Sequence, residues 1–531
     1  MTRFFAGNKS GSGPVVKIMK NDADDPLAIP NANVGKFAFN SEIQTIGYIK
    51  DIFAVDVNFT TYPATGGTAS SPNIYYLPSG ANRENCQVRI RSWIFSGNSF
   101  QVYEYYEAYF AATYGFTFFP LCEVRAALDY TTNKFRGPYV DLHEGAASGK
   151  GQVYSYTGYG SSTYSVLNSG YVGGSTFNRP CVTASATSSG ATISIARTLV
   201  TVWDLPMREE AIPTFVATPV AGQEPIRINS SMCRVARPGY TIADTNLDHY
   251  ILHENKIPAK ILAAGEITVP TGGTATITTR LPVTSQTYMD FVARRQSETT
   301  FWHPPYISSM NESQSLDFTY VVSGSTVVIT SASQYNLVVR YIICANSGAA
   351  PTTGGSNIGW RGTDGVGAFY QVKRPGSHDT AYNLDDIMLD TRLVYMPILA
   401  EGFLNWSGDF PTALSGGDRF KGVRKTNITV ANPDGLLLFP KVGAVYNAPP
   451  NASDYNEPSA VWGKHVVFVN DSTWAGQSTG ESTWINMLSE TSVDIFASNN
   501  NPYLIADSGV SYHNAQLKGV RYYIFGIPTS L

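Results

Sequence analysis

The chain has 531 residues, a formal net charge of −4 and only 15% charged residues. Single hydrophobic cores stop growing near roughly 250–300 residues, so this length predicts more than one domain. The 47 Gly, 30 Pro, 32 Tyr and 26 Phe residues are typical of β-strands joined by turns. A weakly negative chain without clustered Lys and Arg is not expected to bind nucleic acid.

The sequence shows no sign of a membrane segment, a signal peptide or a disulfide scaffold. It has no apolar run of about 18 residues, and its opening MTRFFAGNKSGSGP lacks the apolar stretch of a signal peptide. The five cysteines are widely spaced and contain no CxxC pair, which indicates reduced thiols. We expect a soluble chain that is neither inserted in a membrane nor exported through a signal peptide.

The first predicted unit covers residues 1–215. It opens with the apolar segment VKIMK at 16–20, an Asp-rich turn and the segment KFAFNS at 36–41. A TGGT turn at 65–68, the alternating segment QVRIR at 87–91 and the apolar segment GFTFFP at 115–120 follow. Alternation of apolar and polar residues predicts antiparallel strands, and the unit closes with TLVTVW at 198–203.

A Tyr-rich insertion distinguishes this first unit. Tyr combines a large amphipathic contact surface with a low entropic cost, and the neighbouring Gly and Ser residues let a loop adapt to a partner. The insertion is therefore a candidate recognition surface, and packing against a neighbouring domain or subunit is the alternative interpretation. The candidate residues are Tyr103, Tyr106, Tyr109, Tyr156, Tyr159 and Tyr164.

The second unit, residues 226–346, is compact, and the third, residues 360–531, repeats its opening. Residues 233–265 align without a gap with residues 370–402, so that RPG at 237–239, NLD at 246–248 and ILA at 261–263 each recur. Turn signals at 271–274 and 415–418 occupy the place of the first unit's TGGT, and we interpret all three as hairpins. The closing segments VRYII at 339–343 and VRYYI at 520–524 also match.

These landmarks predict an all-β fold of three tandem diverged β-sandwich-like domains, with loop insertions in the first and third. The segment 318–329 is expected to be an antiparallel pair with a tight turn. Joints rich in Pro, Gly, Ser and Thr separate the units at 216–225 and 346–359. The insertion of the third unit spans 447–490.

Catalytic and metal-binding patterns are weak in this sequence. The string GQSTG at 476–480 precedes Asp494, Asp507 and His513 in the order of an α/β-hydrolase, but it lacks the strand and helix of a nucleophile elbow. The segment GAASGKG at 145–151 lacks the first Gly and the final Ser or Thr of a phosphate loop. The Asp-rich turn at 21–25 and the pair His249 and His253 do not match a calcium loop or a helical zinc site. We predict no enzymatic activity, no cofactor and no metal.

The opening segments V-x-R-P-G and N-L-D-x-x-x-L, with a later apolar strand ending in F-P, resemble the tandem modules of structural proteins from tailed bacteriophages, particularly tail fibres and appendages. The resemblance implies a non-enzymatic virion protein, assembled in the host cytoplasm, whose partners are other virion proteins and further copies of itself. It leaves the part of the particle open, including a tail-associated adaptor.

Two other functions stay open. The first is a receptor-binding protein that recognises host-surface glycan through aromatic platforms. Besides the tyrosines above, its candidate residues are Trp302, Trp406, Trp474 and Trp484. The second is a polysaccharide depolymerase with paired carboxylates, whose required separation is spatial and cannot be recognised in a sequence.

Overall fold

A computed structural model describes the fold, and its strands are antiparallel throughout. The residues that it describes are 3–43, 49–56, 73–74, 86–94, 99–110, 118, 120–129, 134–136, 153–155, 177–178, 185–186, 197–214, 218, 220–256, 260–303, 318–331, 333–414, 423–446, 459–462, 466–468, 484–498, 504–506, 509–511 and 517–529. Within these residues the only helical elements are single 3-10 turns, so the predicted all-β class is confirmed.

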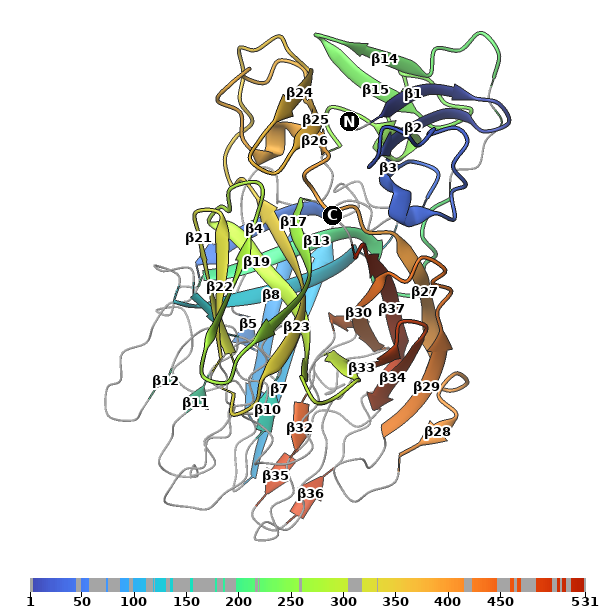
Figure 1. Cartoon of the computed structure of the whole chain (residues 1–531). Coiled ribbons are helices and arrows are strands. Elements are labelled where there is room, and N and C mark those ends of the chain that lie inside the picture. The colour runs from blue at the N-terminus through green and yellow to red at the C-terminus, as the bar shows by residue number, and fades with distance from the viewer. Residues whose placement is uncertain are drawn as a thin grey trace.

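Each predicted unit begins with a three-stranded sheet, which we call its small sheet. The three small sheets have the same strand order, with the second strand in the centre, and they lie at one end of the molecule (Figure 1). The strands are β1 (Phe4–Lys9), β2 (Gly13–Met19) and β3 (Phe37–Asn40) in the first unit, β14 (Ile226–Asn229), β15 (Met232–Ala236) and β16 (Tyr250–Leu252) in the second, and β24 (Gly359–Thr363), β25 (Ala368–Lys373) and β26 (Ile387–Asp390) in the third.

A β-bulge recurs at the same aligned position of every small sheet. The register between the second and third strands shifts after Ile18, Val235 and Val372, which leaves Ala38, Ile251 and Met388 as the extra residues of the third strands. Side chains along a strand normally alternate between the two faces of the sheet, and a bulge lets two consecutive side chains point to the same face. Consequently both Ile251 and Leu252 of the second unit face the same core.

The inner faces of the three small sheets form one shared core. The central strands contribute Val16 and Ile18, Cys233 and Val235, and Val372, and the third strands add Ile251, Leu252, Met388 and Leu389. Phe4 of the first unit stacks on Tyr370 of the third at 4.9 Å between ring centroids. None of the small sheets is therefore an independent layer, because each covers its apolar face with the other two.

The RPG and NLD motifs form one local structure. Pro238 and Gly239 occupy a tight turn in which the Tyr240 amide donates to the Arg237 carbonyl at 3.1 Å, and Gly239 has a φ of +83° that Gly adopts without strain. Arg237 Nε then donates to the carbonyl of Asp248 at 2.9 Å. The arginine thus ties the turn to the NLD segment.

The NLD segments are 3-10 turns that lead into the third strands. These are η5 (Leu247–His249) and η7 (Leu384–Asp386), preceded by Asn246 and Asn383, whose side chains accept a hydrogen bond from the amide two residues later. In the first unit η1 (Val34–Lys36) follows Asn33, which makes no such side-chain bond. The 3-10 turn before the third strand therefore persists in the first unit, although RPG is replaced by Lys20, Asn21 and Asp22.

Each unit continues into a four-stranded arrangement, which we call its large sheet, and the strand order is the same in all three. These strands, in sheet order, are β4 (Ile49–Asp56), β13 (Arg197–Pro206), β8 (Pro120–Asp129) and β9 (Lys134–Arg136) in the first unit, β17 (Ile261–Val269), β23 (Leu337–Asn346), β19 (Gln286–Arg295) and β20 (Phe301–His303) in the second, and β27 (Ile398–Asn405), β37 (Leu517–Ile527), β30 (Leu437–Tyr446) and β31 (Ser459–Trp462) in the third.

The large sheets also share a bulge. The pairing between the first and closing strands shifts after Ile49, Ile261 and Ile398, which face Trp203, Cys344 and Phe525. This register aligns Asp290 of β19 with Lys441 of β30, because they lie opposite the equivalent residues Ile342 and Tyr523. Matching strand order and matching bulges support the three-unit repeat independently of the sequence alignment.

Two large sheets are extended by strands from the following unit. The first unit's sheet continues from β9 into β21 (Phe318–Ser323), β22 (Thr326–Ser331) and β18 (Thr274–Thr278) of the second unit. The second unit's sheet continues from β20 into β33 (Trp484–Ser489), β34 (Ser492–Ser498), β29 (Val423–Thr429) and β28 (Thr412–Ala413) of the third. The sheets therefore cross the unit boundaries, and the domain limits themselves stay a prediction.

A further sheet joins the last unit to the first. Its strands are β5 (Asn73–Ile74), β6 (Cys86–Ile94) and β7 (Ser99–Phe110) of the first unit with β35 (Leu504–Ala506) and β36 (Gly509–Ser511) of the third. The two-stranded pair of β10 (Val153–Ser155) and β32 (Val466–Phe468) joins the same two units, and β11 (Phe177–Asn178) pairs with β12 (Ser185–Ala186). The contact between first and third units thus includes backbone pairing.

One of the predicted hairpins takes a different form. The turn at 270–273 is present, with the Gly273 amide donating to the Pro270 carbonyl at 3.0 Å. However, β17 before it pairs with β23, whereas β18 after it pairs with β22 in another sheet. The hairpin interpretation is wrong here because the turn carries the chain between two sheets. The turns at 65–68 and 415–418 lie outside the described residues, and the predicted pair at 318–329 is confirmed as β21 and β22.

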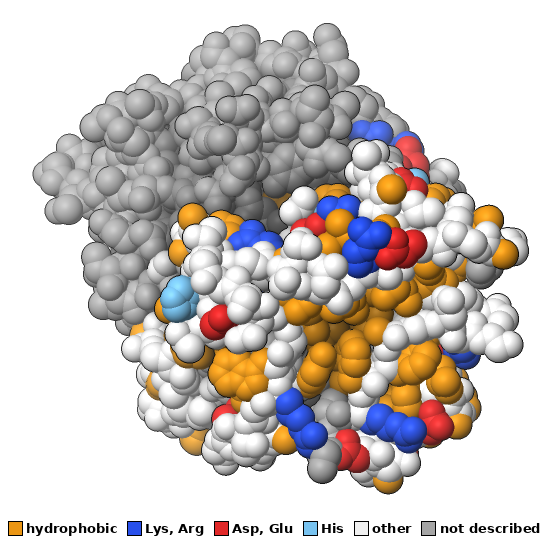
Figure 2. Space-filling view, turned by 90° about the horizontal axis from the view of Figure 1, so that it is seen from above, with side chains coloured by type: hydrophobic (Ala, Val, Ile, Leu, Met, Phe, Trp, Pro, Cys, Tyr) orange, Lys and Arg blue, Asp and Glu red, His pale blue; other side chains and the backbone are white. Residues whose placement is uncertain are grey.

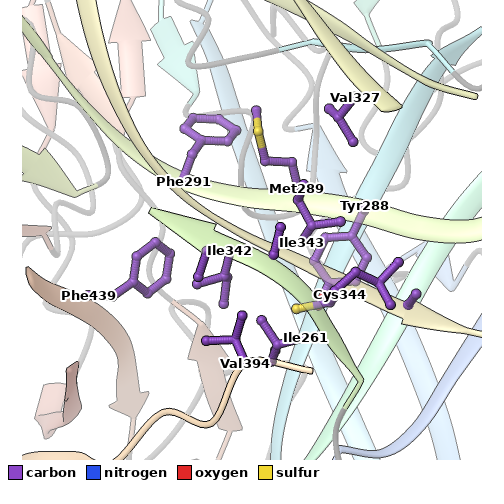
Figure 3. Packing of buried hydrophobic residues seen from close by; sticks show 14 of the residues in the cluster. Ile261, Tyr288, Met289, Phe291, Val327, Ile342, Ile343, Cys344, Val394 and Phe439 are labelled. Carbon is purple, nitrogen blue, oxygen red and sulfur yellow. The ribbon is translucent and has the colours of Figure 1, made fainter. Parts of the chain in front are cut away.

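The main hydrophobic core contains residues from all three units. Ile49 and Trp203 of the first unit, Tyr288 and Ile342 of the second, and Phe439 of the third belong to it. Figure 3 shows Phe439 beside Ile342, and Val394 beside Ile261. Burial of apolar surface across the units therefore helps to hold the large sheets together.

Candidate functional site: the junction of the three units

The three units meet at a buried ion pair. Lys441 Nζ of the third unit lies 2.5 Å from Asp290 Oδ2 of the second, and both side chains are fully buried. The same ammonium group lies 4.4 Å from the ring centroid of Trp203 in the first unit. Three side chains, one from each unit, therefore form one contact in the interior.

This contact affects how strongly the three units associate. Replacing a buried ion pair by packed apolar groups is often neutral, but removing one partner leaves an uncompensated charge and is strongly destabilising. The Lys441 and Asp290 pair consequently makes the association of units conditional on a matched residue in each. The ring of Trp203 adds a cation–π contact to the lysine.

The second and third units are also joined by Arg340. Its Nη2 lies 2.5 Å from Glu266 Oε1 of its own unit and 2.7 Å from Glu490 Oε1 of the third unit. Its Nη1 donates to the Leu438 carbonyl at 2.6 Å, and its guanidinium lies 4.2 Å from the ring of Phe301. Every side of this buried arginine has a partner, as a buried charge requires.

Arg521 occupies the same position in the third unit and reaches the first. Its Nη1 donates to the Glu210 carbonyl at 3.1 Å, and its Nε donates to the Tyr523 hydroxyl at 2.9 Å. That hydroxyl donates in turn to the Pro206 carbonyl. Burial raises the pKa of Tyr523 above its ordinary value, so the phenol stays protonated as this bond requires.

The first and second units meet through neutral groups. The Thr201 hydroxyl donates to Tyr288 Oη at 2.7 Å, and Phe135 stacks on Tyr320 with ring centroids 4.9 Å apart. Asn346 Nδ2 donates to the Ile52 carbonyl at 3.0 Å. Counted from the bulge, Leu199 of β13 takes the place of Arg340 and Arg521, so the closing strand of the first unit lacks this arginine.

Lys260 connects the large region of the second unit with the small sheet of the third. Its Nζ donates to the Ile387 carbonyl at 2.7 Å. Complete burial lowers the pKa of this lysine to about 7, although Asp385, Asp390 and Asp386 raise it in part. A second contact between these two units is the ion pair of Arg280 with Asp364 in the β24–β25 turn, with Nη2 and Oδ1 2.8 Å apart.

The described residues of the weak catalytic and metal patterns make ordinary structural contacts. Asp494 accepts hydrogen bonds from Lys425 and Asn427. His249 Nδ1 lies 2.8 Å from Asp244 Oδ1, and the ring of His253 packs against Tyr250. In the Asp-rich turn, Asp25 accepts from the Leu27 amide. The strings at 145–151 and 476–480, with Asp507 and His513, lie outside the described residues.

No metal centre is recognisable in the described ranges, because they contain no group of three or more His, Cys, Asp or Glu side chains placed to hold an ion. Cys233 and Cys344 are both buried. Burial, together with Glu254, raises the pKa of Cys233 to about 12, so this thiol is protonated and unreactive. Within the same residues no helix has the length and apolar character to cross a membrane.

The predicted recognition residues do not assemble into one described site. Tyr103, Tyr106 and Tyr109 lie on β7 and Trp302 and Trp484 on the neighbouring strands β20 and β33, but their side chains lie outside the described part of the structure. Tyr156, Tyr159, Tyr164 and Trp474 are wholly outside it.

Among the predicted recognition residues, Trp406 alone has a described side chain. It is half-buried, lies 5.5 Å from Phe410 between ring centroids and is covered by the Arg424 guanidinium at 5.2 Å.

Sequence reasoning missed the junction residues. Asp290, Lys441 and Trp203 lie in strands whose pairing partners are set by the tertiary fold, and a lone charge within an apolar strand was the available signal. Comparisons with protein-family models, with curated proteins and with solved structures each found no match.

Proposed function

We propose that the chain is a non-enzymatic structural component of a tailed-phage particle, such as a tail fibre, appendage or tail-associated adaptor. The observation that carries the proposal is the use of buried charge: Lys441, Asp290 and Arg340 all join one unit to another. A rigid body of interlocked sheets suits a particle component that must withstand force and proteolysis. Its partners would be other virion proteins, and its location the virion.

Gradient-purified particles encoded by the same genome provide the test. Peptide mass spectrometry should find the chain in intact particles, and antibody labelling in electron micrographs should place it on the tail. A chain that stays in the host lysate and is absent from washed particles contradicts the proposal. A catalytic turnover of host polysaccharide by the purified chain would contradict its non-enzymatic part.

The alternative of a host-glycan receptor protein draws support from Trp406. A half-buried indole flanked by an arginine is a platform on which a sugar ring can stack. The substitution Trp406→Ala should then reduce adsorption of the purified chain to host cells. Tyr335, which is exposed and carries Arg295 at 4.5 Å, gives the matched control Tyr335→Ala. Equal adsorption by both variants and the wild type contradicts a receptor site at Trp406.

A further inference from the structure

The strand pairings between the three units form a closed ring. The first unit pairs with the second through β9 and β21, and the second pairs with the third through β20 and β33. The third unit returns to the first through β35 and β7. In a linear string of domains the first and last units would not touch, whereas here each unit has two neighbours.

The small sheets repeat this closure at one end of the molecule. The hydroxyl of Tyr395 in the third unit donates to the Asn40 carbonyl in the first, and Phe39 lies 5.4 Å from Tyr395 between ring centroids. The second unit contributes Val235 and Ile251 to the same core. A single unit separated from the others would expose these apolar faces to water.

We infer that the chain is a covalently fused trimer, in which three units linked in sequence occupy the positions that three identical subunits would take in a ring. The assembling unit is then one chain. Identical subunits in a ring place the same contact at every interface. Fusion has allowed the contacts to differ, with a buried ion pair between the second and third units and a bond between two hydroxyls between the first and second.

A fused trimer also has a preferred position in a symmetric assembly. One end carries three small sheets of equal strand order, and viewed from that end hydrophobic side chains gather toward the middle of the described face (Figure 2). A single copy with three equivalent units matches a position of three-fold symmetry in a larger assembly. This last step rests on the proposed function, whereas the ring itself does not.

The oligomeric state of the full chain provides the first test. Mass photometry and sedimentation should show one species at the chain mass of 57.7 kDa. This outcome departs from the homo-oligomer that the sequence analysis predicts. A stable trimer or hexamer would overturn the inference, because the internal units would then not replace further copies.

Cleavage of the joints provides the second test. A specific protease site is inserted after the exposed residues Ala221 and Ala349 in the two joints. After cleavage, the three fragments should elute together at the volume of the uncut chain and separate only in denaturant. Fragments that separate under native conditions would overturn the ring. Both tests use the purified chain, so their failure is distinct from absence of the chain from particles, which bears on the proposed function.

Discussion

The small sheets and the large sheets differ in what a neighbouring unit contributes to them. Each small sheet is complete within its own unit, and the units meet there through side chains on the bulged faces. In the large region the neighbouring unit supplies strands, so backbone hydrogen bonds cross the boundary. Local sequence can specify the first arrangement. The second depends on which distant strand arrives at an open edge.

The largest effect on stability is expected at the buried ion pair that joins the second and third units. Asp290→Asn alone or Lys441→Met alone should lower the free energy of unfolding by about 3–5 kcal/mol, because each leaves a buried charge without its countercharge. The double variant Asp290→Leu with Lys441→Met should recover most of the loss. Chemical denaturation followed by tryptophan fluorescence measures this.

A control for the buried pair is available within the third unit. Lys425 and Asp494 form an ion pair at 2.8 Å in which the lysine is partly exposed. Lys425→Met should cost about 1 kcal/mol or less. If Lys441→Met is as mild as Lys425→Met, the junction does not hold the units together.

The core of the small sheets should respond next. Ile251 is the extra residue of a bulge, and its side chain packs among all three small sheets. Ile251→Ala truncates this side chain, and truncation of a buried Ile costs about 2–4 kcal/mol. Thermal unfolding by circular dichroism measures the change. Ile228→Ala on the exposed strand β14 is the matched control and should stay within about 0.5 kcal/mol. Equal effects of both variants would contradict a shared core.

Lys260 tests the contact between the two regions through pH. Its folded-state pKa of about 7 lies below the ordinary value of 10.5, so the unfolded chain binds more protons at this group between those pH values. The contribution of Lys260 to stability must therefore rise with pH in that window, by at most about 1.4 kcal/mol per pH unit, and the full cost of its burial is present below pH 7.

The variant Lys260→Met isolates this contribution. Because it carries no titrating group at the position, the difference in stability between Lys260→Met and the wild type should shrink as pH rises from 7 to 10. Denaturation midpoints of both chains measured in parallel provide the difference. A difference that is constant across this range would show that burial does not lower the pKa of Lys260 in the folded chain.

The sequence could predict what is local. The RPG and NLD motifs are recognisable because a Pro-Gly turn, an arginine and an Asn cap specify one local structure, and the structure forms it at Arg237 and Asn246. The all-β class follows from alternation. The partner of an edge strand is not encoded nearby: β17 and β18 are separated by a short turn and still join different sheets. Trp203, Asp290 and Lys441 meet only through that topology.

The smallest effect separates the first unit from the other two. Asn246 and Asn383 each accept a hydrogen bond from the 3-10 turn that follows, and at Asn383 the side chain of Asp386 returns the contact in a capping box. Alanine at such a cap costs about 1 kcal/mol. Asn33 makes no side-chain cap, so Asn33→Ala should leave the free energy of unfolding nearly unchanged.

Differential scanning calorimetry of the three variants would rank their unfolding temperatures, with Asn383→Ala the lowest and Asn33→Ala at the wild-type value. Equal losses in all three would mean that the first small sheet uses the same local chemistry as the others, and that its divergent sequence hides a cap rather than lacking one.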